Sequence, residues 1–183
     1  MIKPGQVIKQ FETKKGKVAI IRAPRTSDVQ EITRMINSIV REDDYILLSE
    51  EVKLEDEVKW LRGVIKKNRK ESQVYLLVEI DGKVVGSADV AKCMGRASHT
   101  GGFGIALEAN HREEGIGSVL METVINLAKS DLQLRQLKLE VYKTNIRALG
   151  LYKKMGFKIF GTLPKEVLVK NKYVDAVYMY KEI

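Results

Sequence analysis

A run of residues 74–80 that is apolar except at Glu79, followed directly by Asp81-Gly82, constrains the fold of this chain more than any other feature. A strand that is apolar at nearly every position is typical of a strand covered on both faces. Asp-Gly is a strong signal for a tight hairpin turn, and it joins this run to a second extended segment at residues 83–91. The sequence therefore predicts a central sheet flanked by helices.

Helical and extended segments alternate around this hairpin. Apolar residues at helical spacing predict four helices, which begin after the capping cluster Thr26-Ser27-Asp28, at about Leu54, at Gly115 and at Asn145. Further strands are expected at residues 18–22, 102–107, 136–142, 157–162 and 173–180. We therefore expect an α/β chain of the α+β type, with a mixed central sheet of about six to seven strands and about four helices.

The length of 183 residues suits one domain, and the chain contains no internal repeat or low-complexity linker. We expect a single domain over residues 1–183, in which the basic residues 1–16 form an N-terminal arm. The hydrophobic fraction of 44% and the charged fraction of 31% are those of globular proteins. No apolar run approaches the ~20 residues of a membrane helix, and the first residues lack the apolar core of a signal peptide. We therefore expect a cytoplasmic protein with no membrane partner.

Few residues are available for metal or disulfide chemistry. Cys93 is the single cysteine, and His99 and His111 are the only histidines, so no metal site is expected. The net charge of +8 favours anionic partners, which include nucleic acids and phosphorylated cofactors alike. Because the lysines are spread over the chain and no aromatic-basic motif occurs, nucleic acid is not the expected partner. Exposed strand edges and the aromatic terminal strand are compatible with a homodimer.

Residues 107–118, LEANHREEGIGS, join a glycine-containing strand directly to the long helix. Gly115 and Gly117 leave the backbone N–H groups at the helix start unshielded, and such groups, with the positive end of the helix dipole, bind phosphate. A simpler interpretation is that the glycines only make a tight turn and help the helix pack. A P-loop would need Gly-Lys-Ser/Thr, and a dinucleotide fingerprint would need glycine in place of Leu120, so neither fold is expected.

Two motifs in this region carry a family resemblance. Arg112-x-x-Gly115-x-Gly117 resembles the coenzyme A pyrophosphate loop of the GNAT superfamily of N-acetyltransferases, and Val141-x-x-x-Asn145-x-x-Ala148-x-x-Leu151-Tyr152-x-x-x-Gly156-Phe157 resembles its other signature. The likeness extends from Lys17 to the C-terminus, and the ending is similar to a subgroup that acetylates amino acids and other small amines. Glu113 and Glu114 depart from the pattern, because small or basic residues are commoner there, and like-charge repulsion would lower cofactor affinity.

The resemblance implies that acetyl-CoA is the co-substrate and lies in the splay of the sheet. The backbone of Ile105, Ala106 and Leu107 would align the pantetheine arm and polarise the carbonyl oxygen. Asn145 and Tyr152 match cofactor-contacting positions on the following helix. The residues implied to hold the pyrophosphate are Arg112, Glu113, Glu114, Gly115, Ile116, Gly117 and Ser118.

The chemistry implied is direct attack by a neutral amine on the thioester in a ternary complex. Tyr152 matches the general acid that protonates the departing thiolate, although without the motif it would be interpreted as a ring packed on the sheet. An ammonium with a pKa near ~10 must first lose a proton, so a base or a water chain is needed. Glu140 is the first candidate, by its likeness to a glutamate of the ribosomal-protein alanine acetyltransferase branch. A solvated or salt-bridged strand carboxylate is an equal interpretation.

Glu108, Asp89 and His99 are lesser candidates for the base, whereas His111 is explained as a loop neighbour of Arg112 and Cys93 lacks a base to activate it. The favoured acceptor is the primary amine of a small molecule. One alternative is a protein or peptide N-acetyltransferase acting on N-termini or lysines, for which the acidic residues 42–57 would form a rim. The other is a non-catalytic sensor that binds acyl-CoA.

Overall fold

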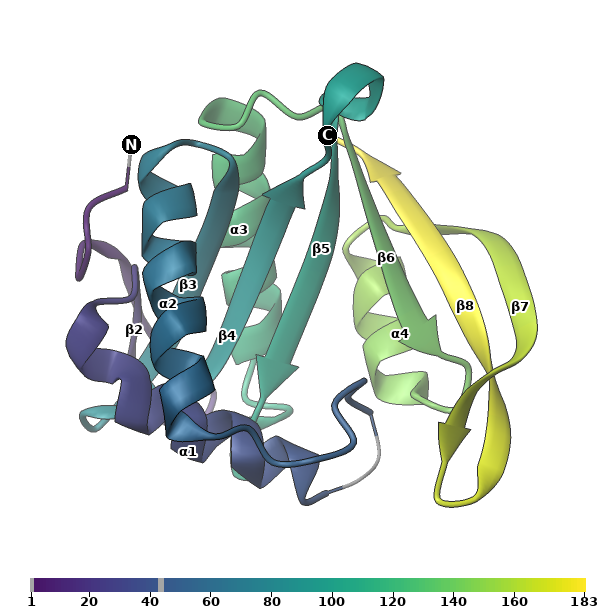
Figure 1. The fold of residues 1–183 in the computed structure, drawn as a ribbon, viewed down its shortest axis with the longest axis horizontal. Helices are drawn as coiled ribbons and strands as arrows, with labels where there is room; N and C mark the ends of the chain where they lie inside the picture. The colour runs from purple at the N-terminus through teal and green to yellow at the C-terminus, as the bar shows by residue number, and fades with distance from the viewer. Residues whose placement is uncertain (1, 43–44) are drawn as a thin grey trace.

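The computed structural model describes residues 2–42 and 45–183, which form one eight-stranded sheet in the order β1-β2-β3-β4-β5-β6-β8-β7 (Figure 1). Neighbouring strands are antiparallel except β5 and β6, which are parallel. The mixed sheet and its helices are confirmed, with one strand more than predicted. The strands are β1 (Val7–Glu12), β2 (Val18–Arg22), β3 (Gln73–Ile80), β4 (Lys83–Lys92), β5 (Thr100–Leu107), β6 (Gln136–Tyr142), β7 (Lys158–Val169) and β8 (Lys172–Glu182). The α-helices of the described residues are α1 (Val29–Val40), α2 (Leu54–Arg69), α3 (Ile116–Ser130) and α4 (Ile146–Lys154).

The helices form two layers, with α1 and α2 on one face of the sheet and α3 and α4 on the other (Figure 1). β3 lies between these layers. Its residues Val74, Leu76 and Val78 pack in the larger core with α3, whereas Tyr75 and Leu77 pack in a second core with α1 and α2. The apolar run of residues 74–80 is therefore covered on both faces, as predicted.

The expected N-terminal arm contains a strand. β1 pairs antiparallel with β2, and its register shifts between Val7 and Lys9. This bulge breaks the alternation of a regular strand, so that Ile8 and Phe11, three residues apart, both pack against the larger core. The prediction that residues 1–16 form only an arm is corrected, since they include β1. The sequence did not indicate this strand because a bulged edge strand does not show period-two hydrophobicity.

The last hairpin is longer than the predicted strands at residues 157–162 and 173–180. β7 continues past Pro164, which falls in a register shift between Leu163 and Val167. Since proline is tolerated in edge strands and at bulges, it interrupts the pairing with β8 without ending the strand. The predicted strand ends at residue 162 because local sequence does not show that pairing with β8 resumes after this shift.

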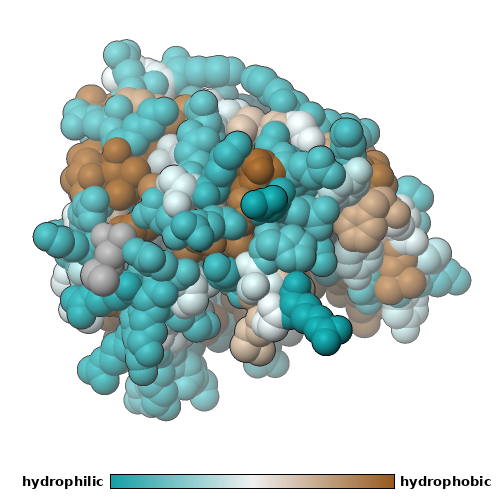
Figure 2. All heavy atoms as spheres, turned by 90° about the horizontal axis from the view of Figure 1, so that it is seen from above, coloured by the Kyte–Doolittle hydropathy of each residue, from teal (hydrophilic) through white to brown (hydrophobic). Residues whose placement is uncertain are grey.

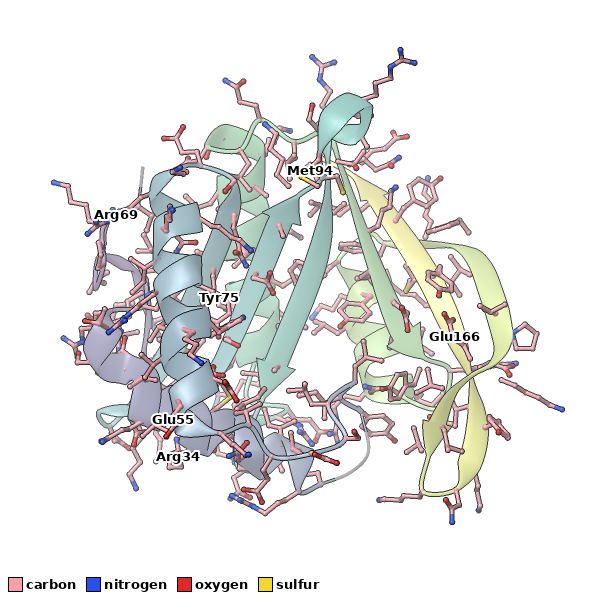
Figure 3. The ribbon with its side chains drawn as sticks, in the orientation of Figure 1. Arg34, Glu55, Arg69, Tyr75, Met94 and Glu166 are labelled. Carbon is pink, nitrogen blue, oxygen red and sulfur yellow. The ribbon has the colours of Figure 1, made fainter. Side chains whose placement is uncertain are left out.

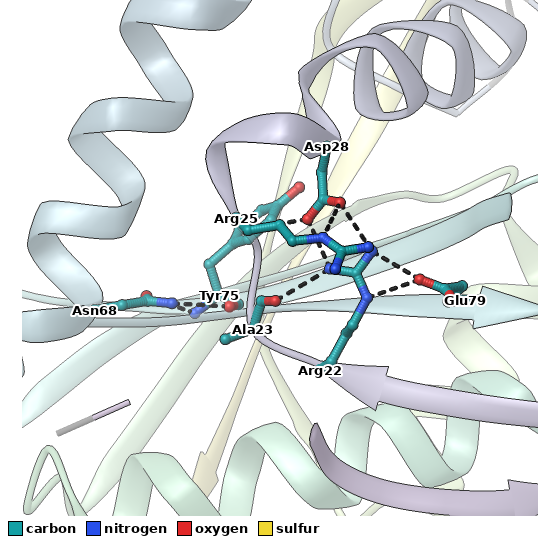
Figure 4. A network of polar contacts seen from close by, with 7 residues as sticks. All are labelled: Arg22, Ala23, Arg25, Asp28, Asn68, Tyr75 and Glu79. Carbon is teal, nitrogen blue, oxygen red and sulfur yellow. Dashed lines mark hydrogen bonds and ion pairs between the residues drawn. The ribbon is translucent and has the colours of Figure 1, made fainter. Parts of the chain in front are cut away.

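A buried ion network fixes β2 to the start of α1 (Figure 4). Arg22, which is 5% exposed, donates to both carboxylate oxygens of Asp28 at 2.6 and 2.9 Å and to Glu79 at 2.8 Å. Asp28 belongs to the predicted capping cluster, but Thr26–Asp28 forms a short 3₁₀ turn and the carboxylate accepts from Arg22 and from the backbone N–H of Arg25. Burial raises the pKa of Asp28, but these hydrogen bonds outweigh it and hold the pKa below its ordinary value.

Viewed from above, the molecule presents mostly hydrophilic side chains, with hydrophobic ones in separate patches between them (Figure 2). Within residues 2–42 and 45–183, no helix combines the length and apolar character needed to cross a membrane.

Candidate active site

A cleft opens where β5 and β6 separate. The two strands pair only from Thr100 to Gly102 on β5, and they diverge beyond that point (Figure 1). The β6-facing edge of residues 103–107 therefore has no partner strand. A cavity of about 450 Å³ occupies this splay, and its lining includes Ile105, Ala106, Leu107, Glu140, Asn145 and Tyr152. The structure thus brings the predicted arm-binding strand, acid and base candidates to one place.

The α1–α2 connection covers one side of this cleft. Tyr45, Ile46 and Leu47 line the cavity, and the Tyr45 hydroxyl lies 3.5 Å from the carbonyl oxygen of Thr144. These residues belong to the acidic stretch 42–57 that was predicted as a possible peptide rim. Asp43 and Asp44 of that stretch lie outside the described residues. The part that lines the cavity beyond them is apolar rather than acidic.

The predicted pyrophosphate loop ends at the N-terminus of α3. Gly115 is the N-cap residue and adopts a left-handed conformation, with φ of 86°. Because glycine has no side chain, nothing from the cap residue covers the first N–H groups of the helix, which include those of Ile116, Gly117 and Ser118. A Cβ atom on Gly117 would lie 3.2 Å from Leu151 Cδ2 and 3.4 Å from Leu107 Cδ1. The glycine therefore permits close packing of α3 against α4 and β5, as in the simpler interpretation, whereas phosphate binding at this helix start remains a prediction.

The Arg112 side chain is engaged by residues outside the start of α3. Its guanidinium donates to both oxygens of Glu42 at 2.6 and 3.0 Å and to the Leu107 carbonyl at 3.0 Å. Its backbone N–H donates to the Ala109 carbonyl. This bidentate pair joins the end of α1 to the loop. The implied contact of Arg112 with pyrophosphate remains a prediction, whereas its contact with Glu42 is a tether that the sequence motif does not indicate.

The acidic pair of the loop is neutralised by distant residues. Glu114 is buried, and one of its oxygens accepts from Lys15 Nζ at 2.9 Å. The hydrogen bond from Lys15 holds the pKa of Glu114 below its ordinary value. Glu113 is exposed and lies 3.2 Å from Arg147 Nε. Both carboxylates have cationic partners, so the repulsion expected from the sequence is reduced.

Asn145 and Tyr152 take different positions on α4. Asn145 is the N-cap residue, and its side-chain oxygen accepts from the Ala148 N–H at 3.0 Å. Tyr152 is 7% exposed, packs against Phe103 and Phe157, and lines the cavity. Burial raises the pKa of its phenol to about 12. The ring therefore packs on the sheet, as in the simpler interpretation, and also borders the cleft as a protonated group.

Glu140 lies on β6 at the cleft and has no hydrogen bond or ion pair with another described residue. Burial and the nearby Glu166 raise its pKa above the ordinary value. Tyr178 is paired with Glu140 in the β6–β8 register, and its hydroxyl donates to Glu166 at 2.5 Å. Glu166 is on the β7–β8 hairpin (Figure 3), whose contribution to this region the sequence did not indicate. Glu140 is exposed, so the solvated carboxylate of the alternative interpretation agrees with the structure, whereas the salt-bridged one does not, since no described residue forms an ion pair with it.

The other base candidates differ in availability. Glu108 accepts from Arg34 at 2.6 Å and from Ser38 at 2.9 Å, so its charge is committed to α1. Asp89 is hydrogen-bonded by Gln73 at 3.0 Å, and burial raises its pKa to about 6. Its carboxylate lies 3.0 Å from the position of a Cβ on Gly104, a residue that lines the cavity. Asp89 is therefore the better placed of the two.

The remaining candidates lie away from the cleft. His99 is exposed and lines a separate hollow with Arg135 and Glu182, near the opposite end of the sheet. His111 lies 3.7 Å from Glu114 behind the loop, and Cys93 is a free thiol outside the cavity lining. Among the residues that the structure describes, no three His, Cys, Asp or Glu side chains form a group that could hold a metal ion.

Known proteins share this sequence pattern and fold. The model of the Acetyltransferase (GNAT) family matches residues 34–157. The chain is 37% identical over 105 residues to the L-amino acid N-acetyltransferase AaaT of Escherichia coli (strain K12), which covers 57% of this chain and 65% of that protein. It is 25% identical over 109 residues to the spermidine N(1)-acetyltransferase of the same strain, covering 60% and 58%. The chain thus spans less than two thirds of these curated relatives. A GNAT-family acetyltransferase structure from Streptococcus pneumoniae superposes with a TM-score of 0.81 and 27% identity, covering 90% of this chain and 99% of that one.

Proposed function

Because the chain belongs to the acetyltransferase (GNAT) family, we propose that it transfers an acetyl group from acetyl-CoA to a primary amine of a small molecule. The reaction proceeds by direct attack in a ternary complex. The observation that carries the proposal is the position of Tyr152. Its protonated phenol borders the cavity in the splay between β5 and β6, beside the helix terminus that the motif assigns to phosphate.

The chain offers a binding surface suited to each part of acetyl-CoA. The N–H groups that begin α3 would donate hydrogen bonds to the diphosphate, since the uncapped start of a helix favours anions. The unpaired edge of residues 105–107 would hydrogen-bond the amides of the pantetheine arm, as a further strand would. The apolar Leu151 and Ala148 line the same cavity and would cover the arm from α4. When bound, the thioester supplies the activated acyl group.

Tyr152 would donate a proton to the sulfur as the thiolate departs. A phenol with a pKa of about 12 keeps its proton throughout the neutral range. Tyr152 lines the cavity while its ring packs against Phe103 and Phe157, so the side chain is positioned before substrate binds. A rigid donor loses less entropy when the reaction begins.

Glu140 would take the proton from the acceptor ammonium, with Asp89 as the second candidate. The two carboxylates lie on strands that flank β5, whose residues Gly102 and Gly104 bear no side chain above this face. An ammonium that entered over these glycines would meet carboxylates on both sides. Burial raises the pKa of both carboxyl groups, and the nearby Glu166 raises that of Glu140 further, so the charged form of each would be stabilised by a cationic acceptor.

Thiol release from acetyl-CoA tests this proposal. The purified chain is incubated with acetyl-CoA and, separately, with amino acids, polyamines and a short peptide that has a free N-terminus. We expect thiol release with a small amine and the acetylated amine as product by mass spectrometry. Release with the peptide alone would establish the protein-acetylating alternative. Binding of acetyl-CoA without turnover on any acceptor would instead support the sensor.

A further inference from the structure

In the predicted pyrophosphate loop, Arg112, Glu113 and Glu114 each have a partner of opposite charge. Arg112 is paired with Glu42, Glu113 with Arg147, and Glu114 with Lys15. The pyrophosphate loop is therefore close to neutral in sum. A diphosphate bound at the start of α3 would meet the partial positive charge of the helix terminus, equivalent to about half an elementary charge, and little else from this loop.

The turn between β1 and β2 lies directly behind this loop. The Lys14 backbone N–H donates to the Glu114 carbonyl at 3.0 Å, and Lys15 Nζ donates to the Glu114 carboxylate at 2.9 Å. The buried Thr13 holds the turn, since its hydroxyl oxygen accepts from the N–H groups of Lys15 and Lys17. Two hydrogen bonds to one loop residue fix the register of the turn against the loop.

This docking places the Lys14 side chain beside the helix start. Its Cγ and Cε atoms lie 3.7 and 3.8 Å from the position that a Cβ on Gly115 would take. Lys14 is exposed, and no ion pair joins its ammonium to another described residue. In contrast, Lys15 and Lys17 in the same turn pair with Glu114 and Asp81. Lys14 is thus the lysine of this turn whose charge is available at Gly115.

We propose that the β1–β2 turn forms part of the cofactor site and that Lys14 supplies the cationic contact for the diphosphate of coenzyme A. This inference rests on the proposed function, since it assumes that coenzyme A binds at the start of α3. The ammonium of Lys14 pairs with a diphosphate oxygen while the helix N–H groups hold the others. Glu114 acts as a positioning residue, because it fixes the turn through Lys15 and through its own carbonyl.

Calorimetric titration with coenzyme A tests the role of Lys14. We expect Lys14→Ala to weaken binding by about five- to tenfold, as loss of one exposed charge-assisted contact would. Lys14→Arg should recover most of the affinity. Lys17→Ala is the matched control, because Lys17 is an exposed lysine of the same turn that pairs with Asp81, and its affinity should equal that of the unaltered chain. All variants should melt within a few degrees of one another.

Titration with 3′-dephospho-coenzyme A separates the phosphate groups. If Lys14 contacts the diphosphate, Lys14→Ala weakens both ligands by the same factor, and the factor shrinks as salt is raised. A loss confined to coenzyme A would assign Lys14 to the 3′-phosphate and overturn the proposal. Equal affinity of Lys14→Ala and Lys17→Ala would also overturn it, with the proposed function intact. If the unaltered chain failed to bind coenzyme A, the proposed function itself would fail.

Discussion

Replacing Tyr152 by phenylalanine should lower turnover by about 10²- to 10⁴-fold and leave the fold intact. With a pKa of about 12, the Tyr152 phenol is ionised in roughly one molecule in 10⁵ at pH 7. The proton donor is therefore present across the assayed pH range. Its removal should abolish the whole rate enhancement that general acid catalysis supplies. Burial raises this pKa, and no described residue is hydrogen-bonded to the hydroxyl, so its removal should change the free energy of unfolding by less than about 1 kcal/mol.

The assay is steady-state thiol release at saturating amine, with acetyl-CoA varied and with pH between 6 and 10. Tyr142→Phe is the matched control, because Tyr142 is also buried and lines the same cleft, but occupies a position at which the motif specifies no residue. We expect Tyr152→Phe to lower kcat, with the KM for acetyl-CoA within about twofold, and Tyr142→Phe to remain near the unaltered rate. Since the raised pKa keeps Tyr152 protonated, no alkaline loss of activity below pH ~11 should trace to it.

The reasoning is refuted if Tyr152→Phe turns over within threefold of the unaltered chain. It is also refuted if both tyrosine variants lose activity equally, since a general effect of deleting a buried hydroxyl would then explain the loss. A fall in kcat that matches a fall in melting temperature would assign Tyr152 to packing against Phe103 and Phe157 rather than to proton transfer.

Four further substitutions test other parts of the site and fold. A base acts only when deprotonated, so kcat should rise with pH through the raised pKa of Glu140, and Glu140→Gln should abolish this limb; an unchanged profile would exclude Glu140. Burial raises the pKa of Asp89 to about 6, so the folded state binds this proton more tightly than the unfolded chain does. Stability from this group should fall as pH rises from about 4 to 6, and Asp89→Asn should flatten that slope in urea melts; parallel slopes would contradict the assignment. Gly117→Val should weaken coenzyme A binding at least tenfold in calorimetry, because a Cβ atom at this position would lie 3.2 Å from Leu151 and displace the helix start. Normal affinity would show that the site does not need glycine at this position. Arg22→Met removes the buried cationic partner of Asp28 and leaves it only the more exposed Arg25, which should cost about 3–5 kcal/mol of unfolding free energy, a loss that additional Asp28→Asn should partly restore.

The elements with strong local signals were predicted well. β2 and β6 have the bounds expected from their residues, and α2 begins at Leu54 as predicted. These segments show a regular hydrophobic period or a specific turn, such as Asp81-Gly82, so local sequence suffices. β1 lacks such a period because its register shifts, and β7 passes through Pro164, so both are set by pairing with a neighbouring strand. That pairing depends on residues the local pattern does not contain.

The site was predicted where a motif names its residues and was not predicted where partners come from distant parts of the chain. Tyr152, Asn145 and Glu140 line one cavity, as the resemblance implied. No local pattern joins Glu42 to Arg112 or Lys15 to Glu114, pairs separated by 70 and 99 residues. Side-chain direction in such pairs follows from tertiary packing.

The departure at Glu113-Glu114 shows why this distinction matters for function. Taken from the sequence, two carboxylates beside a phosphate site predict weak binding, since like charges repel. In the fold, Glu114 is buried against Lys15 and Glu113 faces Arg147. The burial of Glu114 also fixes the β1–β2 turn and so places Lys14 beside Gly115. Under the proposal that Lys14 contacts the diphosphate, Glu114 brings a second cation to the site beside Arg112, which is already paired with Glu42. We therefore expect Glu114 to favour cofactor binding, the opposite of what the loop sequence suggests.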